Sequence, residues 1–369
     1  MASVVNLATL ATLTALKGKG INSIKNVDTQ FVTGQALTTL TASADSIYTT
    51  LDAAAGSPPG YEAIGFKVLD GQNLDFGAGK DTIKVTQLAD SAGATTGVRV
   101  GAGSTFDLGA DNDSVVVSLN GAGSVGIVNN GKVLAGTGID TVVVDARLNG
   151  IVNALGATFD TGSGGDKTDA SSVDGDAIHN EGTIIMGTAA ESDVDTLTGN
   201  SLGHGVLTPA YSPGKFGIYN SGTINMGGGK DVVDALVGGF GGNGVYNLGW
   251  TVTDSKGAVA QDQDVDVVMG FGAGTFNGGG GRNAITLPGG TYTIQYTVKP
   301  ATLKDLASGT ITRDGDTSTV MTFNQFDGIG GSAALAGLHF AFSTPLGAVQ
   351  TLQSLTIAAD GNVTAVNYV

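Results

Sequence analysis

Residues 127–142 read IVNNGKVLAGTGIDTV and contain both halves of a motif that recurs along the chain. The first half is an aliphatic-x-Asn-x-Gly box, and the second is a Gly-x-Gly-x-Asp turn followed by β-branched residues. Glycine adopts backbone conformations that are closed to other residues, and β-branched residues favour strands. The stretch therefore predicts a strand, a tight glycine-rich turn and the start of another strand.

Further copies of both halves lie on either side of this stretch. The Asn box occurs at residues 127–131, 178–182, 218–222 and 245–249. The turn occurs at residues 76–83, 108–115, 135–142 and 226–233, and a degenerate copy at 278–285 carries Asn283 in place of Asp. The Asp residues of the first three turns lie 32 and 27 residues apart, which is the length of one solenoid coil, and stacked coils share one core. The sequence predicts an all-β fold, a parallel β-solenoid of the β-helix or β-roll kind, with its repeat body at residues 68–290.

Both ends of the chain differ from this body. In residues 1–67, apolar residues from Ala36 to Leu51 recur at roughly helical spacing, and Pro58 and Pro59 follow. This pattern predicts one or two short helices that form an N-terminal cap or a docking segment between subunits. Residues 146–176 and 199–215 are rich in turn residues and are predicted to be loops outside the stack.

Residues 291–369 are predicted to form a β-rich C-terminal domain. Residues 291–298 alternate as a strand does, and residues 355–369 are broken by Asp360, Gly361 and Asn362 as in a β-hairpin. This terminal hairpin could close its own sheet or pair with a neighbouring subunit, and the sequence leaves both possibilities open.

Composition narrows the class of protein. The 369 residues include 61 Gly and no Cys, and the net charge is −16 from 33 acidic and 17 basic residues. Nucleic acid needs a basic footprint and is excluded as a partner. Disulfides and thiolate metal sites are excluded as well. No apolar stretch is long enough to predict a membrane span, and no basic region precedes the apolar start as in a secretory signal peptide. The chain is therefore expected to be cytoplasmic, already processed, or exported by a route that reads another signal.

The Gly-x-Gly-x-Asp turns resemble the glycine- and aspartate-rich repeats of RTX proteins, and the Asn-x-Gly boxes resemble repeats of bacterial adhesin and surface-layer β-solenoids. The RTX resemblance implies that calcium is bound by turn carbonyls and Asp carboxylates, which are the hard oxygen ligands this ion prefers. The ligands it implies are Asp81, Asp113, Asp140 and Asp231, with Asp111 as a weaker candidate in the middle of its turn. RTX repeats are tandem nonapeptides, however, whereas here one motif occurs per coil.

Structural roles compete with this interpretation. Each Asp could instead bond backbone N–H groups of its turn. The Asn of each box could stack as a ladder along the solenoid, with its amide bonding the next coil.

Catalytic signals are weak. The three His residues are scattered, and no nucleophile motif appears. The pairs Asp193/Asp195 and Asp264/Asp266 could place two carboxylates on one strand face, as in glycan-cleaving β-helix enzymes, although solvent or metal contacts are favoured. Four aromatic residues could line a sugar groove, although core packing is favoured: Tyr211, Tyr219, Tyr246 and Trp250.

The sequence therefore favours a structural protein, not an enzyme. We expect a secreted, calcium-stabilised protein at the cell surface that self-assembles into a layer, sheath or filament. Its expected partners are copies of itself and, as a second class, cell-surface polysaccharide. An adhesin or carbohydrate-binding β-solenoid is the first alternative, and a polysaccharide lyase or epimerase is the second.

Overall fold

The computed structural model describes residues 24–25, 30–31, 38–41, 44, 46–51, 63–87, 94–188, 191–202, 215–249, 251–253, 259–261, 264–300, 305–331, 340–341 and 351–368. Every regular element in these ranges is a β-strand. No helix in this part of the chain is long and apolar enough to cross a membrane.

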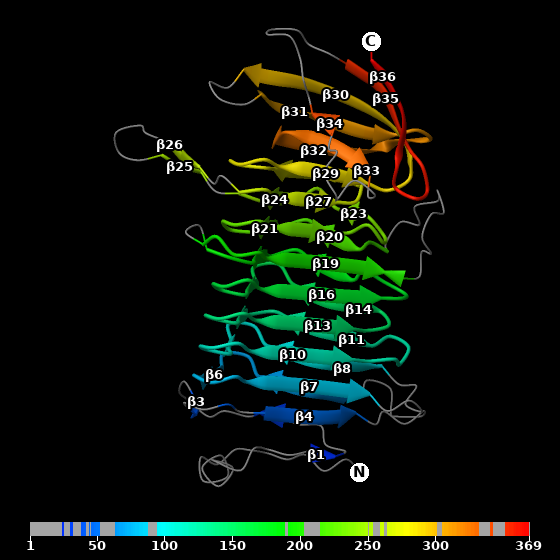
Figure 1. Cartoon of the computed structure of the whole chain (residues 1–369). Helices are drawn as coiled ribbons and strands as arrows, with labels where there is room; N and C mark the ends of the chain where they lie inside the picture. The colour runs from blue at the N-terminus through cyan, green and yellow to red at the C-terminus, as the bar shows by residue number, and fades with distance from the viewer. Residues whose placement is uncertain are drawn as a thin grey trace.

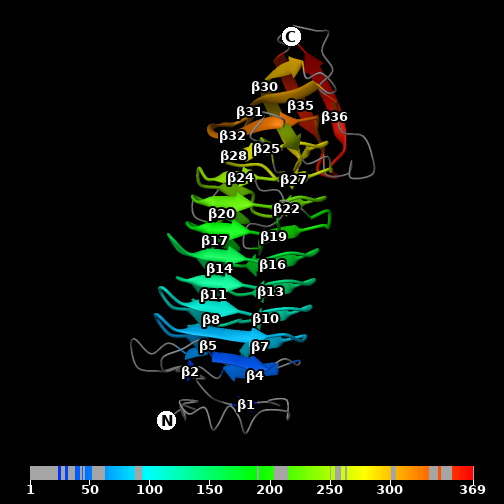
Figure 2. The same ribbon diagram turned by 90° about the vertical axis from the view of Figure 1, so that its left-hand side faces the viewer.

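The strands stack into a tall solenoid whose described N-terminal strands lie at one end and whose C-terminal strands lie at the other (Figure 1). Most of them belong to three sheets, here called sheets A, B and C, with one strand from each sheet in a typical coil (Figure 2). In order, sheet A contains β1 (Ile24–Lys25), β4 (Ser46–Leu51), β7 (Thr82–Gln87), β10 (Ser114–Ser118), β13 (Thr141–Asp145), β16 (Lys167–Ser172), β19 (Thr196–Ser201), β22 (Val232–Asp234), β27 (Val267–Met269), β29 (Ala284–Leu287), β33 (Gly328–Gly331) and β34 (Phe340–Ala341).

Sheet B is shorter than sheets A and C. It contains β2 (Gln30–Phe31), β5 (Ala63–Val68), β8 (Thr95–Val100), β11 (Val125–Asn129), β14 (Asn149–Asn153), β17 (Ile178–Asn180), β20 (Ile218–Asn220) and β23 (Phe240–Gly241). The parallel part of sheet C contains β3 (Thr38–Thr41), β6 (Asn73–Gly77), β9 (Thr105–Asp107), β12 (Lys132–Leu134), β15 (Thr158–Asp160), β18 (Thr183–Ile185), β21 (Thr223–Asn225), β24 (Val245–Asn247) and β28 (Gly274–Asn277).

Equivalent side chains of successive coils form columns in the core. Val115 on β10 pairs with Ile83 on β7 and with Val142 on β13, and all three are buried. The strands alternate buried and partly exposed residues, so a slip of one residue would turn this apolar column to solvent. The parallel β-solenoid predicted from the repeat is therefore confirmed.

The predicted N-terminal helix is wrong for the described residues of this segment. Thr38–Thr41 and Ser46–Leu51 are strands, and β4 pairs in parallel with β7. Ile47 and Leu51 are buried, whereas Tyr48 between them is exposed. Apolar residues four apart fit a strand period of two as well as a helical period of 3.6, and pairing with the next coil selects the strand.

The predicted loop at residues 146–176 is also wrong. It contains β14, β15 and β16, which form a complete coil in register with its neighbours on both sides.

The C-terminal strands depart from the solenoid pattern. Sheet C continues from β28 into β32 (Asp316–Phe326), and then through antiparallel pairs to β31 (Asp305–Arg313), β30 (Gly290–Pro300), β35 (Thr351–Ile357) and β36 (Val363–Tyr368). The predicted terminal hairpin is the β35–β36 pair, and β36 is the last strand of this sheet. A separate small hairpin, β25 (Thr251–Thr253) with β26 (Val259–Gln261), projects from the stack (Figure 1).

Candidate functional site

The glycine-rich turns stack at the corner where the chain passes from sheet C to sheet A. The Ala110 N–H donates to the Gly77 carbonyl oxygen at 2.9 Å, and the Gly79 N–H donates to the Ala110 carbonyl oxygen at 3.1 Å. A Cβ added to Gly136 would overlap the Gly109 carbonyl oxygen of the preceding coil. Glycine is needed there because the turn backbones touch.

The Asp that ends each turn points along the solenoid axis toward the preceding coil. The Asp81 N–H donates to Asp113 Oδ1 at 2.7 Å, and the Asp113 N–H donates to Asp140 Oδ1 at 2.7 Å. The same bond links Asp140 to Asp166, Asp166 to Asp195, Asp195 to Asp231, Asp231 to Asp266, Asp266 to Asn283 and Asn283 to Asp327. We call the seven residues from Asp81 to Asp266 the aspartate column, and each of them is at most 2% exposed.

Burial gives this column unusual acid–base properties. The second carboxyl oxygens of Asp113, Asp140 and Asp195 are buried and have no hydrogen-bond partner among the described residues. Burial raises the pKa of Asp113 to about 7, of Asp140 to about 6 and of Asp195 to about 9. The backbone N–H that each accepts lowers its pKa, and neighbouring carboxylates raise those of Asp113 and Asp195 further. Asp166, raised to about 7 mainly by burial, belongs to the same pattern.

Two kinds of species can neutralise such a column. A proton can stay on a carboxyl group, or a cation can lie between stacked carboxylates, which are about one strand spacing (4.8 Å) apart. Calcium prefers oxygen ligands at about 2.3–2.6 Å. Within the described ranges, no group of three or more His, Cys, Asp or Glu side chains is placed to hold a metal ion. A cation here would therefore depend on pairs of carboxylates together with backbone carbonyls.

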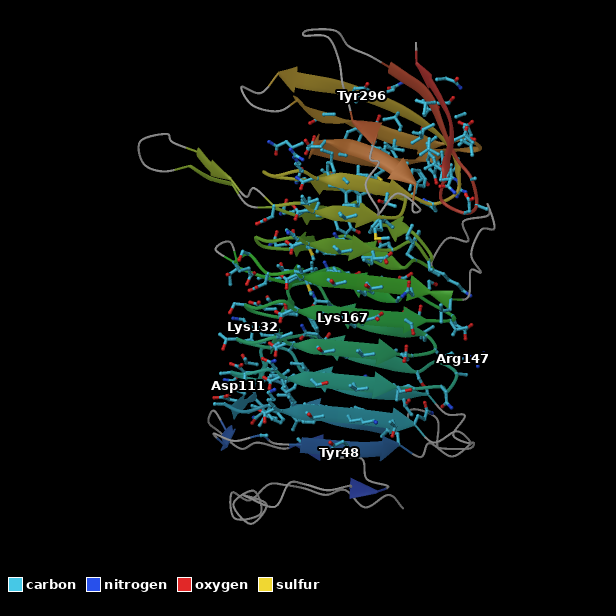
Figure 3. All side chains as sticks on the ribbon, in the orientation of Figure 1. Tyr48, Asp111, Lys132, Arg147, Lys167 and Tyr296 are labelled. Carbon is cyan, nitrogen blue, oxygen red and sulfur yellow. The ribbon has the colours of Figure 1, made fainter. Side chains whose placement is uncertain are left out.

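Four of the five predicted ligands lie in the column, namely Asp81, Asp113, Asp140 and Asp231. Asp111 does not: it lies at the outer edge of its turn, with φ of 80°, and is exposed (Figure 3). Its Oδ2 accepts a hydrogen bond from the Gly79 N–H at 3.2 Å. Asp111 thus takes a position that glycine holds in neighbouring turns.

Sequence reasoning missed Asp166, Asp195 and Asp266. Residues 162–166 do match the Gly-x-Gly-x-Asp pattern, which would have revealed Asp166. The other two follow longer turns without that pattern. The pair Asp193/Asp195 also fails to share one face, because Asp193 is exposed while Asp195 is wholly buried.

A second polar column lies at the corner between sheets B and C. Asn129 Nδ2 donates to Asn153 Oδ1, Asn153 Nδ2 to Asn180 Oδ1 and Asn180 Nδ2 to Asn220 Oδ1, each at 2.8 Å. We call these four buried residues the asparagine column. The predicted ladder is thus present, and Asn153 was missed.

Asn247, which belongs to the fourth Asn box of the sequence, does not join the asparagine column. β24 pairs with β21, so Asn247 lies beside Asn225 in sheet C, and its Nδ2 donates to Asn225 Oδ1 at 2.7 Å. This second ladder continues through Asn277 to Asn324.

Of the four aromatic residues considered for a sugar groove, only Tyr219 and Tyr246 lie in the described part of the chain. Tyr246 is buried and stacks on Phe276, so it lines no groove, while Tyr211 and Trp250 lie outside the described residues. Tyr219 is partly exposed and stacks on His179, with ring centroids 4.6 Å apart. His179 Nδ1 lies 2.8 Å from Asp176 Oδ2, and this hydrogen bond raises the pKa of His179. The chain matched no protein-family model, no curated protein and no solved structure.

Proposed function

We propose that the chain is a secreted structural protein that self-assembles into an extracellular layer, sheath or filament and is stabilised by calcium. The observation that carries the proposal is the pair of buried polar columns that tie coil to coil over most of the solenoid length. A polar network that is satisfied only in one register stiffens and specifies the stack. Such a rod suits a load-bearing or spacing role.

The exposed end of sheet C supports self-assembly. β36 is the last strand in that sheet, and its residues Val363, Thr364 and Ala365 are exposed. An edge strand presents backbone donors and acceptors that another strand can pair with. A second copy of the chain is the partner we propose for this edge.

Calcium fits the charge of the protein. Rods with a net charge of −16 repel one another, and divalent cations reduce that repulsion. Within one rod, the ligands proposed are the column carboxylates Asp81, Asp113, Asp140 and Asp231. An ion bound only by the folded state raises its stability.

Electron microscopy of the purified chain in calcium and in EGTA tests this function. We expect ordered layers or filaments with calcium, and a lower melting temperature in EGTA. A species that stays monomeric under both conditions would exclude self-assembly, and an unchanged melting temperature would exclude calcium stabilisation.

A carbohydrate-binding role is the second candidate, and the stacked Tyr219–His179 pair favours it. Aromatic faces beside an exposed hydrogen-bonding group such as Glu181 suit sugar rings, and Glu181 Oε1 lies 3.5 Å from His179 Nε2. A glycan array with the native chain and Tyr219→Ala separates the two roles, since only a binding module would lose glycan signal in the variant.

A further inference from the structure

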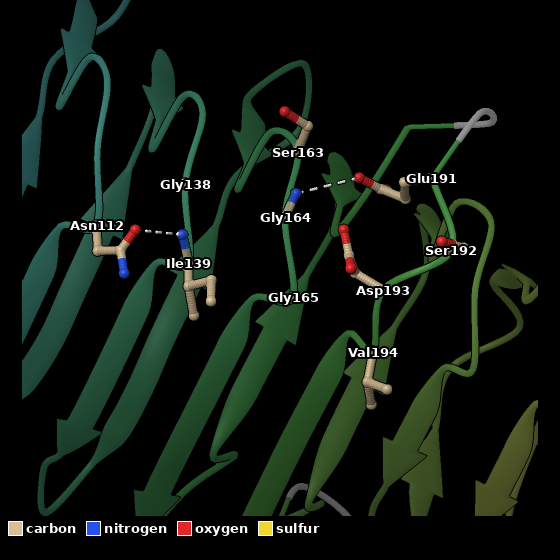
Figure 4. Close-up of a pocket in the computed structure, with 10 residues that line it drawn as sticks. All are labelled: Asn112, Gly138, Ile139, Ser163, Gly164, Gly165, Glu191, Ser192, Asp193 and Val194. Carbon is tan, nitrogen blue, oxygen red and sulfur yellow. Dashed lines mark hydrogen bonds between the residues drawn. The ribbon is translucent and has the colours of Figure 1, made fainter.

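One turn of the aspartate column is built differently from its neighbours. Six positions separate Leu134 from Asp140, whereas ten separate Ile185 from Asp195, although Leu134 and Ile185 both end strands of sheet C. The longer turn brings Glu191 back over the preceding coil. Its Oε2 accepts a hydrogen bond from the Gly164 N–H at 3.2 Å (Figure 4).

Gly187, which begins this turn, faces an unusual set of atoms. A Cβ added to Gly187 would overlap Glu191 Oε1 and Asp195 Oδ2 and would lie 2.8 Å from the Met226 carbonyl oxygen. At Gly136 the same test meets only backbone of the preceding coil. Two carboxylate oxygens of this turn and one carbonyl oxygen of the following coil therefore gather on one side of Gly187.

Asp195 gives independent evidence that this point is a binding position. The residue is wholly buried, and its Oδ1 accepts the Asp166 N–H of the column at 2.7 Å. Its Oδ2 is buried, has no hydrogen-bond partner in the described part of the chain and is directed to the side of Gly187. A buried carboxylate oxygen without a partner is costly unless a proton or a cation compensates it.

We propose that Glu191 Oε1, Asp195 Oδ2 and the Met226 carbonyl oxygen bind a single divalent cation at the Gly187 turn. The all-oxygen donor set selects Ca²⁺ over the softer transition metals. Both carboxylate oxygens approach the same side of Gly187, close enough to each other for one Ca²⁺ with Ca–O bonds of about 2.3–2.6 Å to contact both.

The electrostatics of the turn agree with this site. Burial is the main cause that raises the pKa of Asp195 and of Glu191, and the charges of Asp231, Glu191 and Asp166 raise that of Asp195 further. A cation between the two carboxylates would offset both the burial of these groups and the repulsion between neighbouring carboxylates. The proposal deepens the calcium part of the proposed function and does not depend on self-assembly.

Isothermal titration of CaCl₂ into the full chain at pH 7.5 tests the site, with Glu191→Gln as the main variant. Gln keeps the size of Glu and an oxygen that can accept the Gly164 N–H, but it removes the charge. We expect the tightest calcium to be lost or weakened at least tenfold. Glu181→Gln is the matched control because Glu181 is an exposed glutamate elsewhere on the solenoid, and its calcium binding should match that of the native chain.

Gly187→Ala is a second variant that leaves the charge unchanged. Its methyl group would occupy the space beside both carboxylates, so the tight calcium should again be lost. If Glu191→Gln binds calcium as the native chain does, or if Glu181→Gln weakens it equally, the site is wrong. If the native chain binds no calcium and Glu191→Gln only alters proton uptake on unfolding, the two carboxyl groups share a proton and the proposal is overturned.

Different experimental outcomes would exclude the ion site at Gly187 and the proposed self-assembly. Loss of the tight calcium in Glu191→Gln, together with a monomeric native chain in micrographs, supports the ion site and excludes self-assembly. Calcium-dependent assembly that is unchanged in Glu191→Gln, with unchanged calcium affinity, excludes the ion site alone.

Discussion

The aspartate and asparagine columns run along the same solenoid, yet their chemistry differs. An Asn amide both donates and accepts, so Asn153 donates to Asn180 while it accepts from Asn129. An ionised Asp only accepts, so Asp113 takes the backbone N–H of Asp81 and leaves its other oxygen without a partner. The asparagine column is complete at any pH, whereas the aspartate column needs protons or cations.

The largest expected effect of this difference is a change in the free energy of unfolding with pH. The folded-state pKa values of Asp113, Asp140 and Asp195, at about 7, 6 and 9, lie above the value of 3.8 expected when the chain unfolds. The folded state therefore holds protons that the unfolded state has released. Stability from these groups is complete below about pH 4 and is lost as pH rises through 6 to 9. One pKa unit corresponds to about 1.4 kcal/mol, so the fall should be several kcal/mol.

Urea unfolding in EGTA at pH 5 and at pH 9 measures this fall. Asp316 works in the opposite direction, because hydrogen bonds from Thr319 and Ser318 lower its pKa, but it is close to solvent and its effect should be small. Added calcium should reduce the fall if the ion replaces the protons. A stability that is constant or higher at pH 9 would contradict a protonated column.

The next largest effect is expected when aspartate chemistry is placed in the asparagine column. In Asn153→Asp, the new carboxylate cannot donate to Asn180 Oδ1 or to the Thr183 carbonyl oxygen, which Asn153 Nδ2 now contacts at 2.8 and 3.0 Å. We expect a loss of about 3 kcal/mol at pH 8, with a smaller loss at pH 5, where a protonated carboxyl group can donate. Asn130→Asp, at an exposed neighbour, is the control for the charge itself. Equal losses in the two variants would show that the ladder bond contributes little.

The reverse exchange should be much milder. Asn283 already continues the aspartate column, where its Oδ1 accepts the Asp266 N–H at 3.2 Å and its Nδ2 donates to the carbonyl oxygens of Gly278 and Gly280. Asp140→Asn should therefore keep the link to Asp113 and gain about 1 kcal/mol at pH 8, because a buried group that must ionise is removed. At pH 5 the gain should vanish. Urea midpoints at the two pH values check this, and a loss as large as that of Asn153→Asp would refute the contrast between the columns.

The aspartate column was largely predictable from sequence because its turn has a fixed length. Six positions separate Asp75, Asp107, Leu134 and Asn225, which hold equivalent places in sheet C, from the column residues Asp81, Asp113, Asp140 and Asp231, and the glycines mark the interval. Asp195 was missed because its longer turn breaks the interval and moves Asp193 close to the expected place. Local spacing contains no information about how many residues an insertion adds before the column resumes.

The asparagine column was less predictable because its membership depends on strand pairing. Residues 245–247 resemble residues 218–220 in sequence, yet they lie in sheet C because β23 already occupies the next place in sheet B. Similarly, the apolar spacing from Ile47 to Leu51 fits a helix or a strand, and only the pairing with β7 decides between them. Both errors arose where contacts distant in sequence override a local pattern.

The smallest expected effect concerns Asp111, the predicted ligand that lies outside the column. Its φ of 80° occurs where Gly79 and Gly138 have φ of 121° and 139° in the adjacent turns, so an L side chain is strained there. Asp111→Gly should relieve that strain but lose the hydrogen bond from the Gly79 N–H, for a net gain of about 0.5 kcal/mol. Asp111→Ala, which keeps the strain and loses the bond, should cost about 1 kcal/mol by thermal unfolding. The charge of Asp111 is the smallest of the causes that raise the pKa of Asp113, so either variant should change the pH dependence of stability only slightly, whereas Asp140→Asn should reduce it clearly. A reduction in Asp111→Gly as large as that in Asp140→Asn would mean that the acid–base behaviour extends beyond the buried column to the outer edge of the turns.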